Sequence, residues 1–215
     1  MVRFILSFFG GIFSVLVTGL FFAMLVLGGV FWAYGRDLPS HEQLSQYAPK
    51  TISRVYSGEG RLIDEFAQER RIFVPGEEIP PLVKQAFVSA EDKNFYHHHG
   101  FDPRGMIGAL VEAVKSRGEN VRGASTITQQ VMKNFLLSSD RSVERKIKEL
   151  ILATRLESTL SKDQILELYL NEIFLGQNSF GVAAAAQTYF NKPLTELAPH
   201  EAAMLAAMPQ APGRY

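Results

Sequence analysis

An uncharged N-terminal run constrains the fold of this chain more than any other feature. No charged residue occurs from Phe4 to Gly35, and most positions between them are apolar or glycine. A helix of about 20 apolar residues crosses a bilayer, so residues 4–35 can span one with some tilt. Trp32 and Tyr34 lie at the end of the run, where membrane helices carry aromatic residues. We therefore expect a transmembrane helix at residues 4–35.

A cleaved signal peptide is the alternative interpretation of this run. Its apolar region is normally about 7–15 residues long, which is shorter than the run observed. The sequence Ala33-Tyr34-Gly35 provides only a weak cleavage site. Basic charge before the span comes from Arg3 and the amino terminus, whereas Arg36 is offset by Asp37 after it. The positive-inside rule then favours a short cytoplasmic tail at residues 1–3. We predict a single-pass protein of the inner (cytoplasmic) membrane whose domain lies on the outer side, in the periplasm or outside the cell.

Charge and cysteine content exclude several classes of protein. Lys and Arg total 22, Asp and Glu total 22, and the net charge is zero. Nucleic-acid-binding proteins usually carry a basic surplus, so we expect no nucleic-acid partner. The sequence contains no cysteine, which excludes disulfides, thiolate nucleophiles and cysteine-ligated zinc.

The region after the span begins with a linker and a β-rich segment. Residues 36–50 contain prolines and mixed polar residues, which indicates a juxtamembrane linker before a domain at residues 51–215. Short runs of β-formers at residues 53–57, 61–66 and 70–74 follow, and a Gly-Glu-Gly turn separates the first two. This pattern predicts a hairpin or a small three-stranded element.

The rest of the sequence is helical in pattern. From Pro81 onward, apolar residues recur with the 3.6-residue period of an α-helix. Prolines and hydroxyl residues typical of helix starts precede several of these runs. Helices are expected to begin near Pro81, Pro103, Ser125, Ser142, Ser161, Val182 and Pro199. The predicted fold class is mainly α, with a small β-hairpin element and one preceding transmembrane helix.

Residues 91–100 are the first candidate for chemistry. The adjacent carboxylates Glu91 and Asp92 end an apolar helical pattern and precede an aromatic pair and three histidines. A carboxylate at a helix C-terminus is unfavourable with the helix dipole, which makes it a better proton acceptor. A solvated helix end gives the same pattern, so both interpretations stay open. Consecutive histidines rarely converge on one ion, so we predict no metal site and expect one histidine to be a structural hydrogen-bonding group.

Residues 122–134 are a candidate anion site. A glycine and small residues lead into a helix that begins at Ser125 and Thr126, where free N–H groups and hydroxyls can bind a phosphate or diphosphate. Lys133 lies two turns further along, on the face of Thr126 and Gln130. An ordinary N-cap followed by a polar helix face is the alternative. The segment is not a nucleotide-binding P-loop, because its Gly-Lys-Ser/Thr sequence is missing.

A third candidate combines Arg145, Lys146 and Glu149. Their spacing by three and four residues places them on one side of a helix. Such spacing usually indicates a salt-bridged surface helix. The alternative is a cationic cluster beside a second carboxylate. Residues 162–171 form a fourth segment, whose apolar content indicates a structural role.

In this order, the four segments resemble the signature of the peptidoglycan glycosyltransferases (glycosyltransferase family 51). Residues 91–100 are similar to Glu-Asp-x-x-Phe-x-x-His-x-Gly, and residues 123–134 to Gly-x-Ser-Thr-Ile-x-Gln-Gln-x-x-Lys-Asn. Residues 145–149 are similar to Arg-Lys-x-x-Glu, and residues 162–171 to Lys-x-x-Ile-Leu-Glu-x-Tyr-Leu-Asn. The tail at residues 205–215 resembles the bifunctional class A penicillin-binding proteins more than the monofunctional transglycosylases.

The resemblance implies a lysozyme-like helical fold and the polymerisation of lipid II into β-1,4 glycan strands, with inversion and release of undecaprenyl diphosphate. It implies two catalytic residues: Glu91 as general base on the acceptor 4-hydroxyl, and Glu149, which orients cations or assists near the leaving group. The substrate-binding residues that it implies are Ser125, Thr126, Gln129, Gln130, Lys133, Arg145 and Lys146.

The resemblance implies no required cofactor. Some family members respond to divalent cations, and Asp92 is the one residue that we associate with Mg²⁺ or Mn²⁺. The expected partners are lipid II, the growing glycan strand, the cytoplasmic membrane and other cell-wall synthesis proteins. A lytic glycan-cleaving enzyme is an alternative, because a pair of carboxylates also serves hydrolysis. A non-catalytic membrane-anchored module is the second alternative.

The family pattern is incomplete in these 215 residues. The fifth motif, an Arg-rich helix ending in Val-Leu-x-x-Met, does not occur, nor does the Ser-x-x-Lys of a serine transpeptidase. We therefore expect the chain to be the N-terminal part of a longer protein. Its glycosyltransferase domain would lack the C-terminal part, and a transpeptidase domain would follow.

Overall fold

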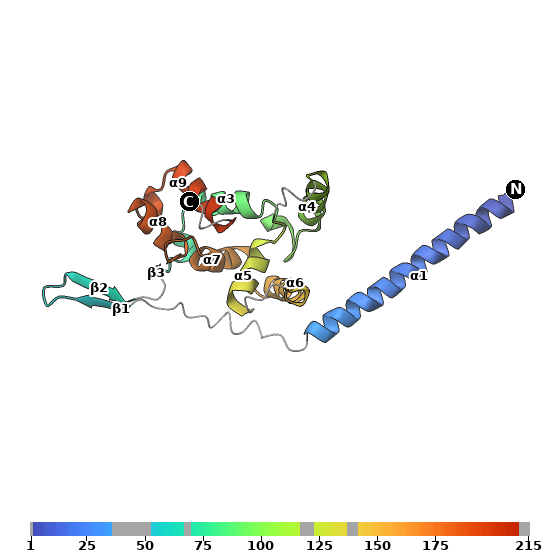
Figure 1. The fold of residues 1–215 in the computed structure, drawn as a ribbon, viewed down its shortest axis with the longest axis horizontal. Helices are drawn as coiled ribbons and strands as arrows, with labels where there is room; N and C mark the ends of the chain where they lie inside the picture. The colour runs from blue at the N-terminus through green and yellow to red at the C-terminus, as the bar shows by residue number, and fades with distance from the viewer. Residues whose placement is uncertain (1, 36–52, 67–69, 117–122, 137–141, 211–215) are drawn as a thin grey trace.

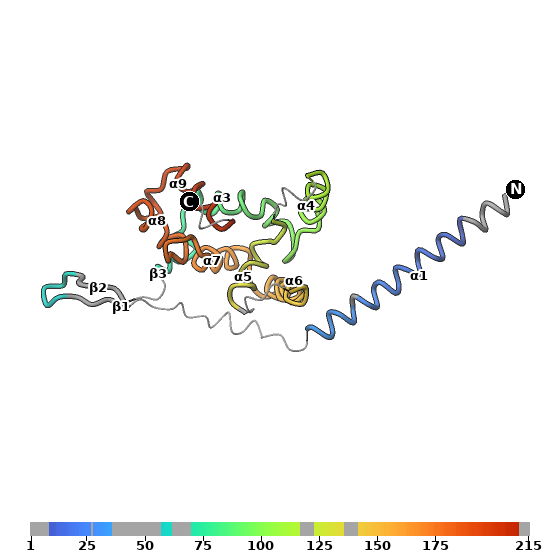
Figure 2. Tube along the Cα trace, in the orientation of Figure 1, coloured from blue at the N-terminus to red at the C-terminus, as the bar shows by residue number. Residues whose placement is uncertain are grey.

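The computed structural model describes residues 2–35, 53–66, 70–116, 123–136 and 142–210. A long N-terminal helix projects from a body of shorter helices, and a small hairpin lies on the opposite side of that body (Figure 1). The Cα trace in Figure 2 shows the same arrangement. The predicted linker at residues 36–50 lies outside the described residues.

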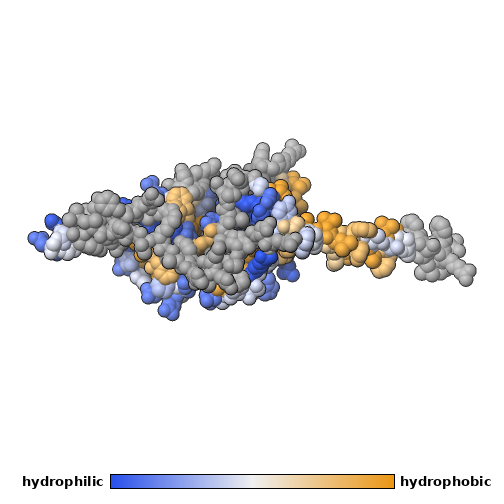
Figure 3. Space-filling model, turned by 90° about the horizontal axis from the view of Figure 1, so that it is seen from below, coloured by the Kyte–Doolittle hydropathy of each residue, from blue (hydrophilic) through white to orange (hydrophobic). Residues whose placement is uncertain are grey.

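Helix α1 (Val2–Gly35) confirms the predicted N-terminal helix. Its segment from Phe9 to Gly35 has a mean hydropathy of 2.3 and is, by length and composition, a candidate membrane span. Figure 3 shows its hydrophobic surface projecting beyond the body. The C-terminal end of α1 contacts the body, because the Nη2 of Arg155 donates to the carbonyl oxygen of Gly35 at 2.9 Å. Membrane crossing and orientation stay predictions.

The β-rich segment forms the predicted hairpin. Strands β1 (Ser53–Tyr56) and β2 (Leu62–Phe66) pair antiparallel, with Ser53 opposite Phe66. The next strand, β3 (Arg70–Arg71), instead pairs parallel with β4 (Ser179–Phe180). The three-stranded alternative is therefore wrong for the described strands. Local sequence cannot reveal a two-residue strand whose partner is this distant.

The body consists of helices that begin where local capping signals predicted. Pro81 occupies the first turn of its helix, Ser142 caps another, and Ser161 with Gln164 forms a capping box. The α-helices are α3 (Pro81–Glu91), α4 (Pro103–Lys115), α5 (Ile127–Leu136), α6 (Val143–Glu157), α7 (Lys162–Glu172), α8 (Val182–Phe190) and α9 (Pro199–Ala207). The short 3₁₀ helices are η1 (Gly76–Glu78), η2 (Phe95–His97), η3 (Leu194–Glu196) and η4 (Met208–Gln210).

The core lies around α7. Helix α3 packs against α9, and α5 packs against both α6 and α7. Figure 1 shows α7 beneath α3 and beside α5. The fully buried side chains of α7 are Ile165, Leu166, Tyr169 and Leu170. The predicted mainly α fold with a small hairpin is confirmed, and the lysozyme-like fold expected of the family fits this arrangement.

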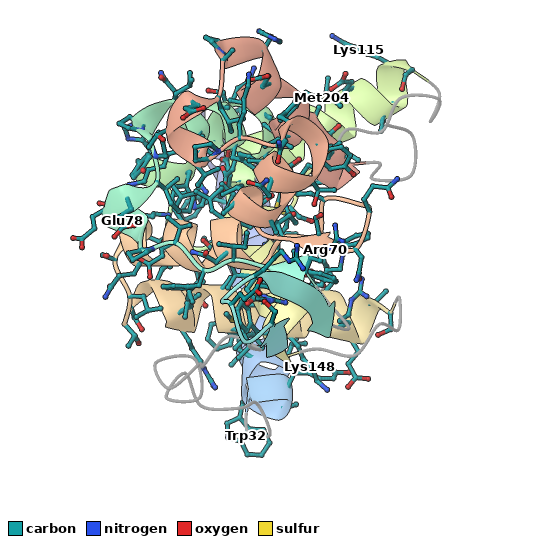
Figure 4. All side chains as sticks on the ribbon, turned by 90° about the vertical axis from the view of Figure 1, so that its left-hand side faces the viewer. Trp32, Arg70, Glu78, Lys115, Lys148 and Met204 are labelled. Atoms are coloured by element: carbon teal, nitrogen blue, oxygen red, sulfur yellow. The ribbon has the colours of Figure 1, made fainter. Side chains whose placement is uncertain are left out.

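Helix α4 differs from the other helices of the body because it contributes no buried residue. Its apolar side chains are exposed instead, namely Met106, Ile107, Leu110, Val111 and Val114. The helix lies on the side of the body toward which α1 projects (Figure 1). Its last residue, Lys115, points away from the body. In Figure 4, Lys115 lies at the top of the molecule and Trp32 of α1 at the bottom.

Candidate active site

Glu91 is the last residue of α3, as the sequence predicted. The helix ends there because Asp92 leaves helical geometry, with φ −153° and ψ 77°. The Nε2 of Gln130 on α5 donates to Oε2 of Glu91 at 2.8 Å. The other oxygen, Oε1, is buried and has no hydrogen-bond partner among the described residues. Glu91 is therefore held at one oxygen only.

The neighbouring carboxylate serves the fold. Asp92 is buried, and its Oδ2 accepts a hydrogen bond from the backbone N–H of Ile127 at 3.0 Å. The Nε2 of His98 contacts the same oxygen at 2.9 Å. Asp92 thus stabilises the first turn of α5, whose free N–H groups need acceptors. His98 confirms the prediction of one structural hydrogen-bonding histidine, while His97 and His99 are exposed.

Thr126 and Gln129 cap the start of α5. The N–H of Thr126 donates to Oε1 of Gln129, and the N–H of Gln129 donates to Oγ1 of Thr126, both at 3.2 Å. The Thr126 hydroxyl also donates to the carbonyl oxygen of Gly100 at 2.7 Å. These contacts fit the N-cap interpretation of the segment for these two buried residues. Their predicted role in substrate binding stays a prediction.

The third candidate forms a cluster on the inner side of α6. The side chain of Glu149 is only 4% exposed, and Arg145 pairs with it at 3.0 Å. Lys146 pairs with its other oxygen at 2.9 Å. A salt-bridged surface helix is therefore the wrong interpretation for Glu149. Because this face turns inward, the apolar residues Ile147 and Leu150 of the same helix are only half-buried.

Lys146 joins this cluster to the start of α5. Its Nζ donates to Oγ of Ser125 at 2.8 Å and to Oε1 of Gln129 at 3.3 Å. Since Gln130 contacts Glu91 from the same helix, the first turn of α5 links both predicted catalytic carboxylates. Lys133 is the exception, because it is exposed further along α5 and forms no hydrogen bond or ion pair to this cluster within the described part of the chain.

A cavity of about 250 Å³ opens beside Glu91 and Ser125. On its far side, α4 contributes Gly105, Gly108 and Ala109, small residues that leave room between the helices. Glu91 thus borders this open cavity and is not a fully solvated helix end.

A buried polar chain behind the site was not predicted from the sequence. The Thr128 hydroxyl donates to Oε1 of Glu157 at 2.6 Å, and Lys162 donates to the same oxygen at 2.7 Å. The Nζ of Lys162 also lies 3.5 Å from Nδ1 of His98. These contacts tie α5, α6 and α7 together behind Asp92. His98 and Lys162 occur in the first and fourth segments, but spacing within each segment could not show that they meet.

The structure offers little for a divalent cation. No group of three or more metal-binding side chains occurs among the residues described. Both oxygens of Asp92 already accept hydrogen bonds, from His98 and Ile127. The dependence on Mg²⁺ or Mn²⁺ stays a prediction, and no chemical step is assigned to a cation.

Comparison with known proteins defines the class. The family model described as transglycosylase matches residues 59–215. The chain therefore belongs to the transglycosylase family, and the resemblance to the peptidoglycan glycosyltransferases is confirmed, as is the expectation of an enzyme of this class.

Particular relatives are penicillin-binding proteins 1A. That of Rickettsia felis is 48% identical over 199 residues, which cover 89% of this chain and 25% of the relative. That of Neisseria flavescens is 49% identical over 178 residues, which cover 83% and 22%. The crystal structure of penicillin-binding protein 1A from Haemophilus influenzae matches with a TM-score of 0.37 and 27% identity, covering 77% of this chain and 15% of that one. The chain spans about a quarter of the length of the relatives it matches in sequence.

Proposed function

We propose that this chain polymerises lipid II into β-1,4 glycan strands, with inversion and release of undecaprenyl diphosphate. The observation that supports it most is the placement of Glu91 and of the Arg145–Lys146–Glu149 cluster on the two sides of the first turn of α5. A base for the acceptor and cations for the leaving group are the two requirements of this reaction.

Glu91 acts as the general base. The acceptor 4-hydroxyl is a weak nucleophile and must lose its proton during attack. Gln130 orients the carboxylate through Oε2, and the carboxylate borders the cavity. The acceptor sugar would enter this cavity with its 4-hydroxyl toward Glu91.

The cluster on α6 stabilises the departing diphosphate. Its charge needs positive groups that are already in place when it develops. Glu149 holds Arg145 and Lys146 in position, and Lys146 is 48% exposed, so a diphosphate can reach it. Ser125 lies beside Lys146 and offers a hydroxyl donor. Thr126, Gln129 and Lys133 complete the proposed donor side.

The lipid-linked substrate places the protein at a membrane surface. Helix α1 would anchor the chain in the inner membrane, with residues 1–3 in the cytoplasm and the domain at residues 51–215 outside. The exposed apolar face of α4 would contact the lipid, which explains its lack of a protein partner among the described elements. The glycan strand and other cell-wall synthesis proteins are the further proposed partners.

The Glu91→Gln substitution tests this function in the full-length protein. The amide keeps an acceptor for Gln130 but cannot take a proton, so polymerisation should be abolished while lipid II still binds. Glu77→Gln, at an exposed position in η1, is the matched control and should retain activity. Near-full activity of Glu91→Gln would contradict the assignment of the base. Incubation with finished peptidoglycan separates polymerisation from lysis, because a lytic enzyme would release fragments from it.

A further inference from the structure

Two buried polar atoms near the site lack hydrogen-bond partners among the described residues. One is the hydroxyl of Tyr169 on α7, and the other is Oε1 of Glu91. A buried donor or acceptor without a partner costs free energy, so such groups usually find one. Because both atoms lie near the candidate active site, a hydrogen bond between them during the reaction would satisfy both.

A contact between an aromatic ring of α3 and one of α7 brings Tyr169 toward Glu91. The Tyr169 ring packs edge-on against Phe87, with ring centroids 6.2 Å apart and planes at 72°. Phe87 and Glu91 are four residues apart and share one side of α3. The Tyr169 ring therefore lies against the side of α3 that ends at Glu91.

Electrostatics agree with this placement. Burial, followed by the negative charges of Glu91 and Asp92, raises the pKa of Tyr169 well above its usual 10.0. The phenol is therefore a proton donor throughout the working pH range. Asp92 already accepts from His98 and Ile127, whereas Oε1 of Glu91 accepts no hydrogen bond from any described residue. Glu91 is the acceptor that remains.

We propose that Tyr169 is a positioning residue that donates a hydrogen bond to Oε1 of Glu91 during the reaction. The proposal rests on the proposed role of Glu91 as general base. Gln130 holds Oε2 and Tyr169 holds Oε1, so that the plane of the carboxylate is fixed. Each carboxylate oxygen has two acceptor sites, which leaves room for the proton of the substrate. The added donor also favours the ionised carboxylate, which is the form that works as a base.

Tyr169→Phe tests the role in catalysis, because it removes one oxygen and keeps the ring on Phe87. In the full-length protein, kcat should fall on the order of tenfold with an unchanged KM for lipid II. The acidic limb of the pH–kcat profile should move to higher pH, since a donor to the charged carboxylate is lost. Tyr189→Phe is the matched control: this hydroxyl donates to the carbonyl oxygen of Leu175 at 2.8 Å, and its loss should lower stability without moving the pH profile.

A second measurement is independent of activity. Tyrosine labelled with ¹³C at Cζ gives a Tyr169 resonance that is identified by its absence in Tyr169→Phe. This resonance should shift in Glu91→Ala and stay in place in Glu77→Ala. An unshifted resonance in Glu91→Ala, or a wild-type kcat and pH profile in Tyr169→Phe, overturns the positioning role. Full activity of Glu91→Gln overturns the proposed base instead, and the resonance still decides whether the two side chains interact.

Discussion

Lys146 is the residue that connects most of the candidate site. It contacts Ser125 and Gln129 on one side and Glu149 on the other, and it is nevertheless about half exposed. A buried carboxylate beneath an accessible amine keeps the cation in place without hiding it. This arrangement suits a charge that appears only when the leaving group departs.

Replacing Lys146 by alanine should reduce the rate of lipid II polymerisation. Loss of one preorganised charge that stabilises a transition state costs about 10²–10³-fold in kcat. A continuous polymerisation assay on the full-length protein measures this rate. Lys148→Ala is the control on the same helix, because Lys148 pairs with the exposed Glu144 on the outer side. Equal rates for both variants would contradict the role of Lys146.

For individual residues, the sequence predicts which of them share a helix face but not which other element covers that face. The spacing of Arg145, Lys146 and Glu149 correctly indicated one side of α6. The burial of Glu149 depends on α5, which packs there from another part of the chain. Likewise, the contact of Asp92 with the N–H of Ile127 joins residues 35 positions apart. Local patterns carry no information on such contacts.

Among the elements, the loop between α3 and α4 fixes the start of α5. Its Gly100 has a φ of +87°, and a Cβ there would lie 2.8 Å from the backbone carbonyl carbon of Ala153. The carbonyl oxygen of Gly100 also accepts from Thr126. The loop is thus packed against α6 and bonded to α5 at one residue.

Gly100→Ala should therefore destabilise the domain by about 3 kcal/mol, through backbone strain and overpacking. The free energy of unfolding, from denaturant titration followed by circular dichroism, measures the loss. Gly60→Ala is the control, because Gly60 also has a positive φ, +77°, but a Cβ added there would meet no atom within 4 Å. A loss no larger than that of the control would show that the contact with α6 contributes nothing.

The N-terminus of α4 should be sensitive to acid. Asp102 caps this helix by accepting from the N–H of Arg104 at 3.0 Å. The hydrogen bond from Asn94 is the largest cause that lowers the pKa of Asp102 below its ordinary 3.8. Burial opposes it, and the backbone N–H groups of Gly105 and Arg104 lower the pKa further. The stabilisation is thus present above pH 3.8 and is lost as the pH falls through the lowered folded-state value.

Amide hydrogen exchange across the first turn of α4 measures this loss. Protection should fall in the wild type as the pH drops below 3.8. Asp102→Asn should keep the same protection at each pH, because asparagine also caps helices but does not titrate. A pH-dependent loss in both proteins would assign the effect to another group.

The element starts were predictable because their signals are local. A proline at the first helical position of α3 and the Ser161–Gln164 capping box of α7 act within one turn. The partner of β3 was not predictable, since β4 follows more than half of the domain later. Parallel pairing of two-residue strands depends on the packing of the helices between them.

For the whole molecule, α1 and α4 lie on the same side of the body (Figure 1), and both expose apolar side chains. The sequence predicted α1 as an apolar element through its long uncharged run. For α4 it predicted only a helix with an apolar side. Whether that side faces the core or the solvent depends on the neighbouring helices. Two separate apolar elements on one side suit a protein that meets its substrate at a membrane.

Polar substitution of the α4 face tests that contact. The triple variant I107Q/L110Q/V114Q should raise the KM for lipid II in proteoliposomes at least about tenfold, because exposed apolar area that meets lipid is lost. Its thermal stability should not change, since these side chains contact no core. Val143→Gln, at an exposed position at the start of α6, is the control. An unchanged KM in the triple variant would show that α4 does not contact the bilayer.

The contact of Arg155 with Gly35 fixes the distance between the end of α1 and the cationic cluster on α6. Arg155 lies near the end of α6 and Lys146 near its start, so nine residues of rigid helix separate the C-terminal end of α1 from the cationic cluster. At 1.5 Å per residue, this spacer is roughly 14 Å long. Because α6 runs across the direction of α1 (Figure 1), its length sets how far to the side of α1 the cluster lies. An additional turn would move the cluster by about 5 Å, beyond the reach of a hydrogen bond.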